Sequence, residues 1–134
     1  RSQARLEALR ASLGPAAAAL PLQVADASDP ATLAALCAAA RTVVSTVGPY
    51  ALHGEPLVAA CAGSGTDYAD LTGEVQWIRR MIESHEPDAR ASGARLVHAC
   101  GFDSIPSDLG VLFLQRHARA RLGQPCARVS MRVR

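Results

Sequence analysis

Three side chains that can transfer a proton stand just after short apolar runs of the chain. Tyr50 and His53 follow the Val- and Thr-rich run 42–46, and Asp103 follows the run 94–100. Phenol, imidazole and carboxyl groups are common general acids and bases in enzymes. We therefore treat these three residues as candidate catalytic residues. The alternatives are an exposed loop position for Tyr50 and His53, and a helix N-cap for Asp103.

The first of these runs ends in small residues that leave room for a ligand. Ser45 and Thr46 carry hydroxyl groups able to bond to a ribose or a phosphate, and Gly48-Pro49 follows closely. Glycine lets a ligand approach the backbone, and proline stiffens the turn. The pattern predicts a nucleotide-binding loop, with an ordinary strand-to-loop corner as the alternative.

Other groupings of reactive residues point to no further site. Three acids gather in one segment: Asp67, Asp70 and Glu74. No His stands at ligand spacing from them, so we predict no metal site. A hydrolase triad of Ser104, His98 and Asp108 is rejected because no GxSxG elbow surrounds the serine. The cysteines form no CxxC pair and are expected in the core: Cys37, Cys61, Cys100 and Cys126.

Strand and helix patterns alternate along the chain and must position these residues. Strands are expected at 20–25, 42–46, 66–71, 94–100 and 126–134. Helices are expected at 2–13, 30–40, 55–63, 75–92 and 106–122, with Pro87 either starting a new turn or kinking its helix. Single helices between strands predict an α/β fold with a parallel sheet and flanking helices. Ligands bind such sheets at the carboxyl ends of the strands, so loops 47–54 and 100–106 should form a common rim.

Composition excludes several classes of protein. The 134 residues carry a net charge of +2, and every basic residue is a scattered Arg, so we expect no nucleic-acid partner. No apolar run approaches the roughly 18 residues that a membrane span needs, and the start of the sequence has no signal-peptide core. The sequence predicts a cytoplasmic protein without a transmembrane segment.

Two blocks carry a resemblance to a known family: "STVGPYALHGEPLVAACAGSGTDYADLTGE" and "GARLVHACGFDSIPSDLG". They resemble the saccharopine dehydrogenase-like oxidoreductases, and within them the bacterial trans-acting enoyl reductases of polyketide-lipid synthesis. The resemblance implies a Rossmann domain that binds NADP. It also implies that Arg1 and Ser2 match the end of a "GRS" segment that holds the 2′-phosphate, and that Asp26 borders the adenine. Gly101 and Phe102, in the second block, are assigned to the cofactor as well.

The chain departs from the family pattern at both ends. It contains no GxGxxG or GATGxxG loop, which should open the first βα unit. We therefore expect residues 1–124 to be a partial Rossmann NAD(P)-binding domain lacking its first βαβ unit, and 125–134 to be the first strand of a missing substrate domain. With the usual strand order, the segment 20–25 should then close up against 42–46, with Val24 beside Val43 or Val44.

The resemblance implies an internal fragment of an NADPH-dependent enoyl reductase, inactive by itself. Its substrate would be a small molecule or a lipid-like polyketide intermediate, and any membrane association would come through that lipid substrate. A homo-oligomer would form through the missing domain. The alternatives are an amino-acid dehydrogenase of the saccharopine reductase kind, and a non-catalytic NADP-binding or lipid-associated protein.

Overall fold

Helices and strands alternate through the central part of the chain, as predicted. The computed structural model describes residues 2–132. Its elements are α1 (Gln3–Ser12), η1 (Pro15–Ala17), α2 (Pro30–Ala39), β1 (Thr42–Ser45), α3 (Tyr50–His53), α4 (Glu55–Ser64), β2 (Asp67–Asp70), α5 (Val75–Ser92), β3 (Leu96–Val97) and α6 (Ile105–Leu122). The α/β fold class, the parallel sheet and the flanking helices are confirmed. Two details differ: α3 forms inside the expected loop 47–54, and α5 continues through Pro87.

The sheet has three parallel strands in the order β1-β2-β3. Val43 lies opposite Tyr68, and Tyr68 lies opposite Leu96. Because all three strands run the same way, their carboxyl ends meet at one edge. The loops after β1 and β3 therefore share that edge, as predicted. They are not direct neighbours, since β2 and its loop lie between them.

The predicted strand at 20–25 is wrong, and so is its predicted pairing with the strand at 42–46. Residues 20–25 form no strand, and Val24 has no partner in the sheet. Local contacts hold the ends of this segment instead: Arg10 donates a hydrogen bond to the Leu20 carbonyl, and just after the segment Asp26 N donates to the Thr32 hydroxyl. Pro21 has no N–H to offer a neighbouring strand. The outer edge of β1 is left unpaired.

The last two predicted strands are also shortened or missing. Only Leu96–Val97 of the run 94–100 joins the sheet. Residues 126–132 form no strand, because the Gln115 side chain holds both the N–H and the carbonyl of Cys126 and turns the chain back along α6. Positions 133–134 lie outside the described residues.

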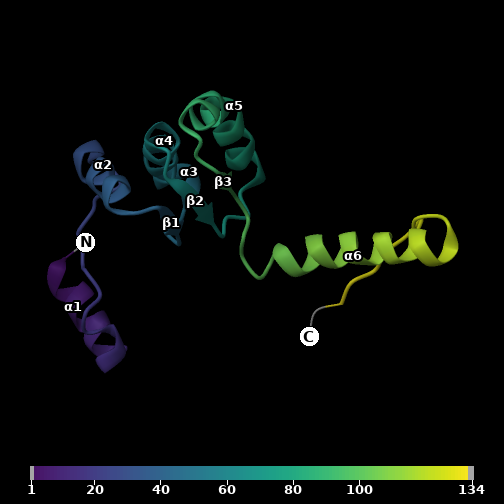
Figure 1. The fold of residues 1–134 in the computed structure, drawn as a ribbon, viewed down its shortest axis with the longest axis horizontal. Coiled ribbons are helices and arrows are strands. Elements are labelled where there is room, and N and C mark those ends of the chain that lie inside the picture. The colour runs from purple at the N-terminus through teal and green to yellow at the C-terminus, as the bar shows by residue number, and fades with distance from the viewer. Residues whose placement is uncertain (1, 133–134) are drawn as a thin grey trace.

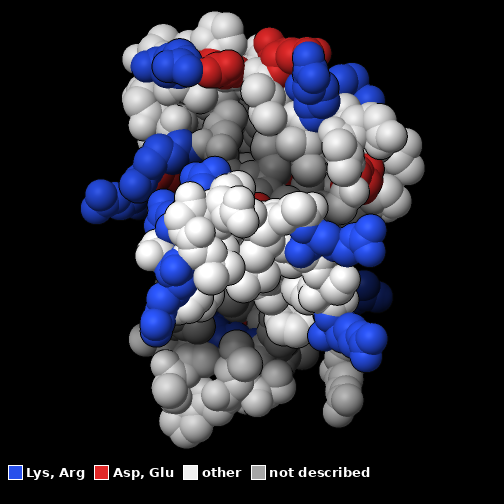
Figure 2. All heavy atoms as spheres, turned by 90° about the vertical axis from the view of Figure 1, so that its right-hand side faces the viewer, with Lys and Arg blue, Asp and Glu red and all other residues white. Residues whose placement is uncertain are grey.

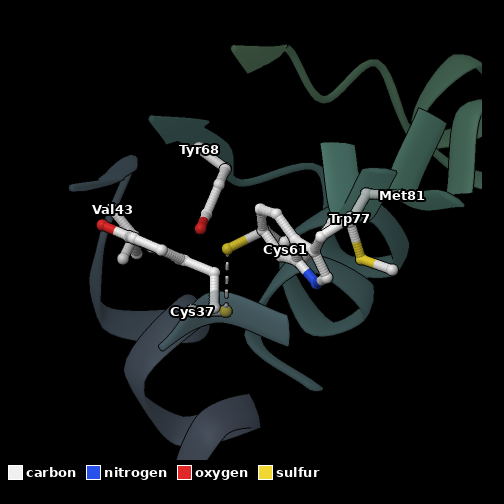
Figure 3. Close-up of a cluster of buried hydrophobic side chains, with 8 residues drawn as sticks. Cys37, Val43, Cys61, Tyr68, Trp77 and Met81 are labelled. Carbon is white, nitrogen blue, oxygen red and sulfur yellow. Dashed lines mark hydrogen bonds between the residues drawn. The ribbon is translucent and has the colours of Figure 1, made fainter. Parts of the chain in front are cut away.

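The core lies on one face of the sheet, between the strands and the helices α2, α4 and α5 (Figure 1). Its buried side chains are Cys37, Val43, Tyr50, Val58, Cys61, Tyr68, Trp77 and Met81, most of them shown in Figure 3. Trp77 is central, with its ring centroid 5.4 Å from that of Tyr50. A Cβ atom at Gly54 would lie 2.6 Å from the Trp77 ring, so only glycine fits there.

The cysteines divide between the core and the surface. Cys37 and Cys61 are buried with their Sγ atoms 3.7 Å apart (Figure 3). Cys100 is exposed and Cys126 is partly buried, so the expectation that all four lie in the core is wrong. Cys100 lies just beyond the shortened strand β3, which explains why a core position predicted from a longer strand fails.

The opposite face of the sheet is bare. Val44, Ala69 and Val97 form one row across the three strands, and Val44 and Val97 are 69% and 52% exposed. Helix α6 extends away from the sheet (Figure 1). The chain exposes 9572 Å², against roughly 6,700 Å² expected for a compact monomer of this mass.

Apolar side chains lie along α6 without a covering layer. The exposed ones are Ile105, Leu109, Val111, Leu112, Phe113, Leu114 and Leu122. Seen from the α6 end of the molecule, uncharged side chains fill the centre of the surface and Arg side chains stand mainly at its margins (Figure 2). Among the residues described, no helix combines the length and the apolar character needed to cross a membrane.

Candidate functional site

The candidate site is the carboxyl edge of the sheet, where loops 46–54, 71–74 and 98–104 meet. We call these three loops the rim. The rim contains most of the residues predicted from the sequence, and the peptide bond between Gly48 and Pro49 in its first loop is cis. The parallel strands β1, β2 and β3 deliver the loops to the same edge.

Glu74 fastens the second loop to the first. Its two carboxylate oxygens accept hydrogen bonds from Tyr50 N at 2.7 Å and from Ala51 N at 2.8 Å. These amides open α3 and have no partner within the helix. Hydrogen bonds to an ionised carboxylate are stronger than neutral ones, so Glu74 holds the loop after β1 firmly.

Tyr50 points into the protein rather than toward a ligand. It is buried, and its hydroxyl donates to the Ser45 carbonyl at 2.9 Å and accepts from Leu71 N at 3.5 Å. Burial raises the pKa of Tyr50, and the nearby Asp70 and Glu74 carboxylates add to this rise. The geometry gives the hydroxyl a structural role, which the prediction of a proton donor did not include.

Asp70 joins the second loop to the third. This side chain is almost fully buried, and its Oδ1 accepts hydrogen bonds from Thr72 N at 3.2 Å and Ala99 N at 2.9 Å. Its Oδ2 lies 2.6 Å from Nδ1 of His98. Burial by itself would raise the pKa of the Asp70 carboxyl, but the hydrogen bonds from His98, Ala99 and Thr72 together hold it below its ordinary value.

The pairing of Asp70 with His98 was missed from the sequence. Asp70 had been considered only within an acid-rich segment, and His98 only within a rejected triad. The usable signal is their position: each follows by one residue the ladder pair Ala69 and Val97 on adjacent strands. Two polar residues at matching strand ends of a parallel sheet lie side by side.

Several predicted residues are exposed on the rim. Thr46, Gly48, Pro49 and His53 are exposed in the first loop, and Phe102 is 80% exposed in the third. Asp103 is also exposed, and its carboxylate accepts no hydrogen bond from the described residues. The helix N-cap is Ser104, so the alternative interpretation of Asp103 as the cap is wrong.

Gly101 is needed for the close approach of two rim loops. A Cβ atom at this position would lie 3.0 Å from the Leu71 side chain and 2.6 Å from the Asp103 carboxylate. Ser45, by contrast, is buried, and its hydroxyl accepts a hydrogen bond from Val47 N at 3.5 Å. Its predicted hydroxyl contact with a cofactor is therefore not supported by the geometry, whereas Thr46 remains accessible.

The structure describes two of the three residues predicted to bind the 2′-phosphate and the adenine of the cofactor. Arg1 lies outside the described residues, and Ser2 lies at the start of α1, where its carbonyl accepts from Arg5 N. Asp26 shares a cavity of about 310 Å³ with Val47, so it does lie beside the first rim loop. Hydrogen bonds from the Ser28 hydroxyl and amide lower the pKa of Asp26.

Within residues 2–132, no group of three His, Cys, Asp or Glu side chains is arranged to hold a metal ion.

Comparison with known proteins gives consistent names. The chain is 55% identical over 127 residues to a trans-acting enoyl reductase of Mycobacterium leprae (strain TN), covering 94% of this chain. It is similar to trans-acting enoyl reductases. Another, from Mycobacterium ulcerans (strain Agy99), is 57% identical over 118 residues, which cover 88% of this chain. A putative trans-acting enoyl reductase of Mycobacterium tuberculosis is 56% identical over 119 residues, which cover 89%.

These alignments have a clear limit. The aligned residues span 30%, 28% and 28% of the three relatives' own lengths. No protein-family model matches the chain, and no solved structure does. The comparisons therefore support a relationship to enoyl reductases along most of this chain, and they leave the wider saccharopine dehydrogenase-like family as a prediction.

Proposed function

We propose that this chain forms part of the cofactor-binding domain of an NADPH-dependent enoyl reductase that acts on polyketide or lipid intermediates. The supporting observation is the identity of 55–57% to proteins named trans-acting enoyl reductase, over most of the chain. In this proposal residues 1–124 belong to a Rossmann-type domain without its first βαβ unit, and 125–134 lead into a substrate domain.

The rim has the properties that a dinucleotide site requires. Dinucleotides bind across the carboxyl ends of a parallel sheet, against small residues and backbone. Thr46 and Gly48 are exposed at the end of β1, and Phe102 presents an uncovered ring at the end of β3. We assign Thr46, Gly48, Pro49, Gly101 and Phe102 to the cofactor. When bound, NADPH supplies the hydride for reduction of a carbon–carbon double bond.

The residues of the chain would then supply the proton. Reduction of an enoyl group places a proton on the carbon next to the carbonyl, and a general acid within hydrogen-bond reach provides it. His53 and Asp103 are exposed on rim loops, whereas the Tyr50 hydroxyl is already bonded to Ser45. We therefore propose His53 and Asp103 as the candidate donors and assign Tyr50 to loop structure.

The test uses the complete protein with NADPH and an enoyl thioester. We expect NADPH oxidation that depends on the thioester, with reduced turnover in His53→Gln or Asp103→Asn. Binding of NADPH without turnover would favour the non-catalytic alternative. Turnover only with an amino-acid-derived imine would favour the amino-acid dehydrogenase. If the wild-type protein does not bind NADPH, the proposed function is wrong.

A further inference from the structure

An unbroken series of hydrogen bonds crosses the carboxyl edge of the sheet. Glu74 holds the start of α3, and Glu74 N in turn donates to the Thr72 hydroxyl at 3.1 Å. Thr72 N donates to Asp70, and Asp70 accepts from Ala99 N. The two carboxylates of Asp70, at the end of β2, and Glu74, in the loop after β2, therefore hold both other rim loops in place.

A second contact strengthens the tie to the third loop. Cys100 N donates to the Asp70 carbonyl at 2.7 Å, so Asp70 binds this loop through its backbone as well as its side chain. Asp70 and Thr72 are both 1% exposed. The folded protein loses stability when one partner of such a buried hydrogen bond is removed, because the remaining polar group then has neither water nor protein to bond to.

This series of hydrogen bonds holds the exposed rim loops and involves few of the core side chains. The core side chains lie between the sheet and α2, α4 and α5, and most of them make no part of the series. The loops that it fastens carry exposed Gly48, Phe102 and Asp103. A loop held in its binding conformation before a ligand arrives loses less entropy on binding, so ligand affinity depends on this fastening.

We infer that Asp70 and Glu74 are positioning residues that together set the affinity of the rim for NADPH. Neither touches the cofactor in this inference; each acts through the loops that its carboxylate holds. Asp70 orders the loop with Gly101 and Phe102, and Glu74 orders the loop with Gly48 and Pro49. The inference rests on the proposed function and adds to it the residues that preorganise the site.

The experiment compares Glu74→Gln and Asp70→Asn with the matched control Glu83→Gln in the complete protein. Glu83 is exposed on α5, where it pairs with Arg79 away from the rim. A glutamine has one acceptor oxygen in place of two, so one of the amides of Tyr50 and Ala51 loses its partner. We expect NADPH to bind about tenfold more weakly to each rim variant, as for the loss of one charge-assisted hydrogen bond.

Amide hydrogen exchange provides the second measurement. We expect faster exchange at Tyr50 and Ala51 in Glu74→Gln, with core amides of α4 and α5 unchanged. In Asp70→Asn, exchange at Thr72 and Ala99 should rise more than exchange at these core amides, which follows only the lower global stability of that variant. A merely structural role of Glu74 would instead raise exchange throughout the domain. At saturating NADPH, kcat should remain near the wild-type value while KM for NADPH rises.

The outcomes separate the two proposals. If the wild-type protein binds NADPH and both rim variants bind it as tightly as Glu83→Gln, the inference is wrong and the proposed function stands. Weaker binding by Glu74→Gln that accompanies domain-wide exchange also overturns the inference. If the wild-type protein itself fails to bind NADPH, both proposals fall.

Discussion

Nδ1 of His98 lies 2.6 Å from Oδ2 of Asp70, and both residues stand one position beyond the last pair of the β2–β3 ladder. The pair is buried, with 6% and 0% of the two side chains exposed. A carboxylate in this position fixes which imidazole nitrogen carries the proton, because the nearby Nδ1 donates to it. The contact also joins β2 to β3 at the point where their ladder ends.

Acid should weaken the domain through Asp70. Its folded-state pKa is held below the ordinary value of 3.8, so the stabilisation is fully present above that value and is lost as the pH falls through the lower folded-state pKa. Asp70→Asn should lower the free energy of unfolding at neutral pH by about 3 kcal/mol. When the pH is lowered through the titration of the carboxyl group, the stability of Asp70→Asn should also fall less than that of the wild-type protein.

Urea unfolding at several pH values measures this effect. Asp29→Asn is a suitable control, because Asp29 is an exposed N-cap of α2 outside the buried network. Equal acid sensitivity in wild-type and Asp70→Asn would contradict the prediction.

Gly54→Ala should destabilise the core. The added Cβ would lie 2.6 Å from the Trp77 ring and 2.8 Å from the Tyr50 carbonyl, and neither the buried ring nor the backbone has room to move. We expect a loss of about 2 kcal/mol, typical of overpacking, measured by chemical denaturation.

Gly63→Ala, within α4, provides the control for Gly54, which caps the start of that helix. A Cβ at Gly63 meets nothing within 4 Å, so alanine should stabilise α4 by about 0.5–1 kcal/mol through its higher helix propensity. Opposite signs for the two substitutions are expected. A neutral Gly54→Ala would show that Trp77 can be displaced easily.

Thiol reagents should distinguish the cysteines. Cys100 is exposed and should react in the folded protein. Burial, together with the neighbouring Cys37, raises the pKa of Cys61 to about 12, so almost no reactive thiolate is present at neutral pH. Mass spectrometry after brief labelling should find Cys100 modified and Cys37 and Cys61 protected until denaturant is added. Rapid labelling of Cys61 in the native state would disprove the packing of α2 on α4.

The isolated chain should bind NADPH poorly. The pyrophosphate of a dinucleotide normally sits on the amides of a glycine-rich loop, and these 134 residues contain no such motif. We expect a titration to show affinity weaker than micromolar. Micromolar binding by this chain would mean that the rim holds the cofactor without that loop.

Sequence patterns correctly predicted the elements that short-range signals define. The β-branched run at 42–46 predicted β1, and the helices predicted at 55–63, 75–92 and 106–122 match α4, α5 and α6 to within one residue. Each of these helices ends at a glycine with positive φ: Gly65, Gly93 and Gly123. Such signals depend on neighbours in sequence, so they can be recognised without knowing the fold.

Features that depend on distant contacts were missed. Residues 20–25 alternate like a strand, but no described strand pairs with them, and Arg10 bonds to the Leu20 carbonyl instead. The rim network needs the register of β2 against β3, which places Asp70 beside His98. Composition and spacing identified the exposed rim residues, whereas the carboxylates that hold them required the three-dimensional arrangement.

The uncovered row of Val44, Ala69 and Val97 also defines the width of this face of the sheet. Three strands separated by about 4.8 Å make a surface about 10 Å wide between the outer two. An α-helix with its side chains has a diameter of about 10 Å, so the width matches one helix lying along the strands. One helix lying along the strands would therefore cover the part of this face that β1, β2 and β3 form.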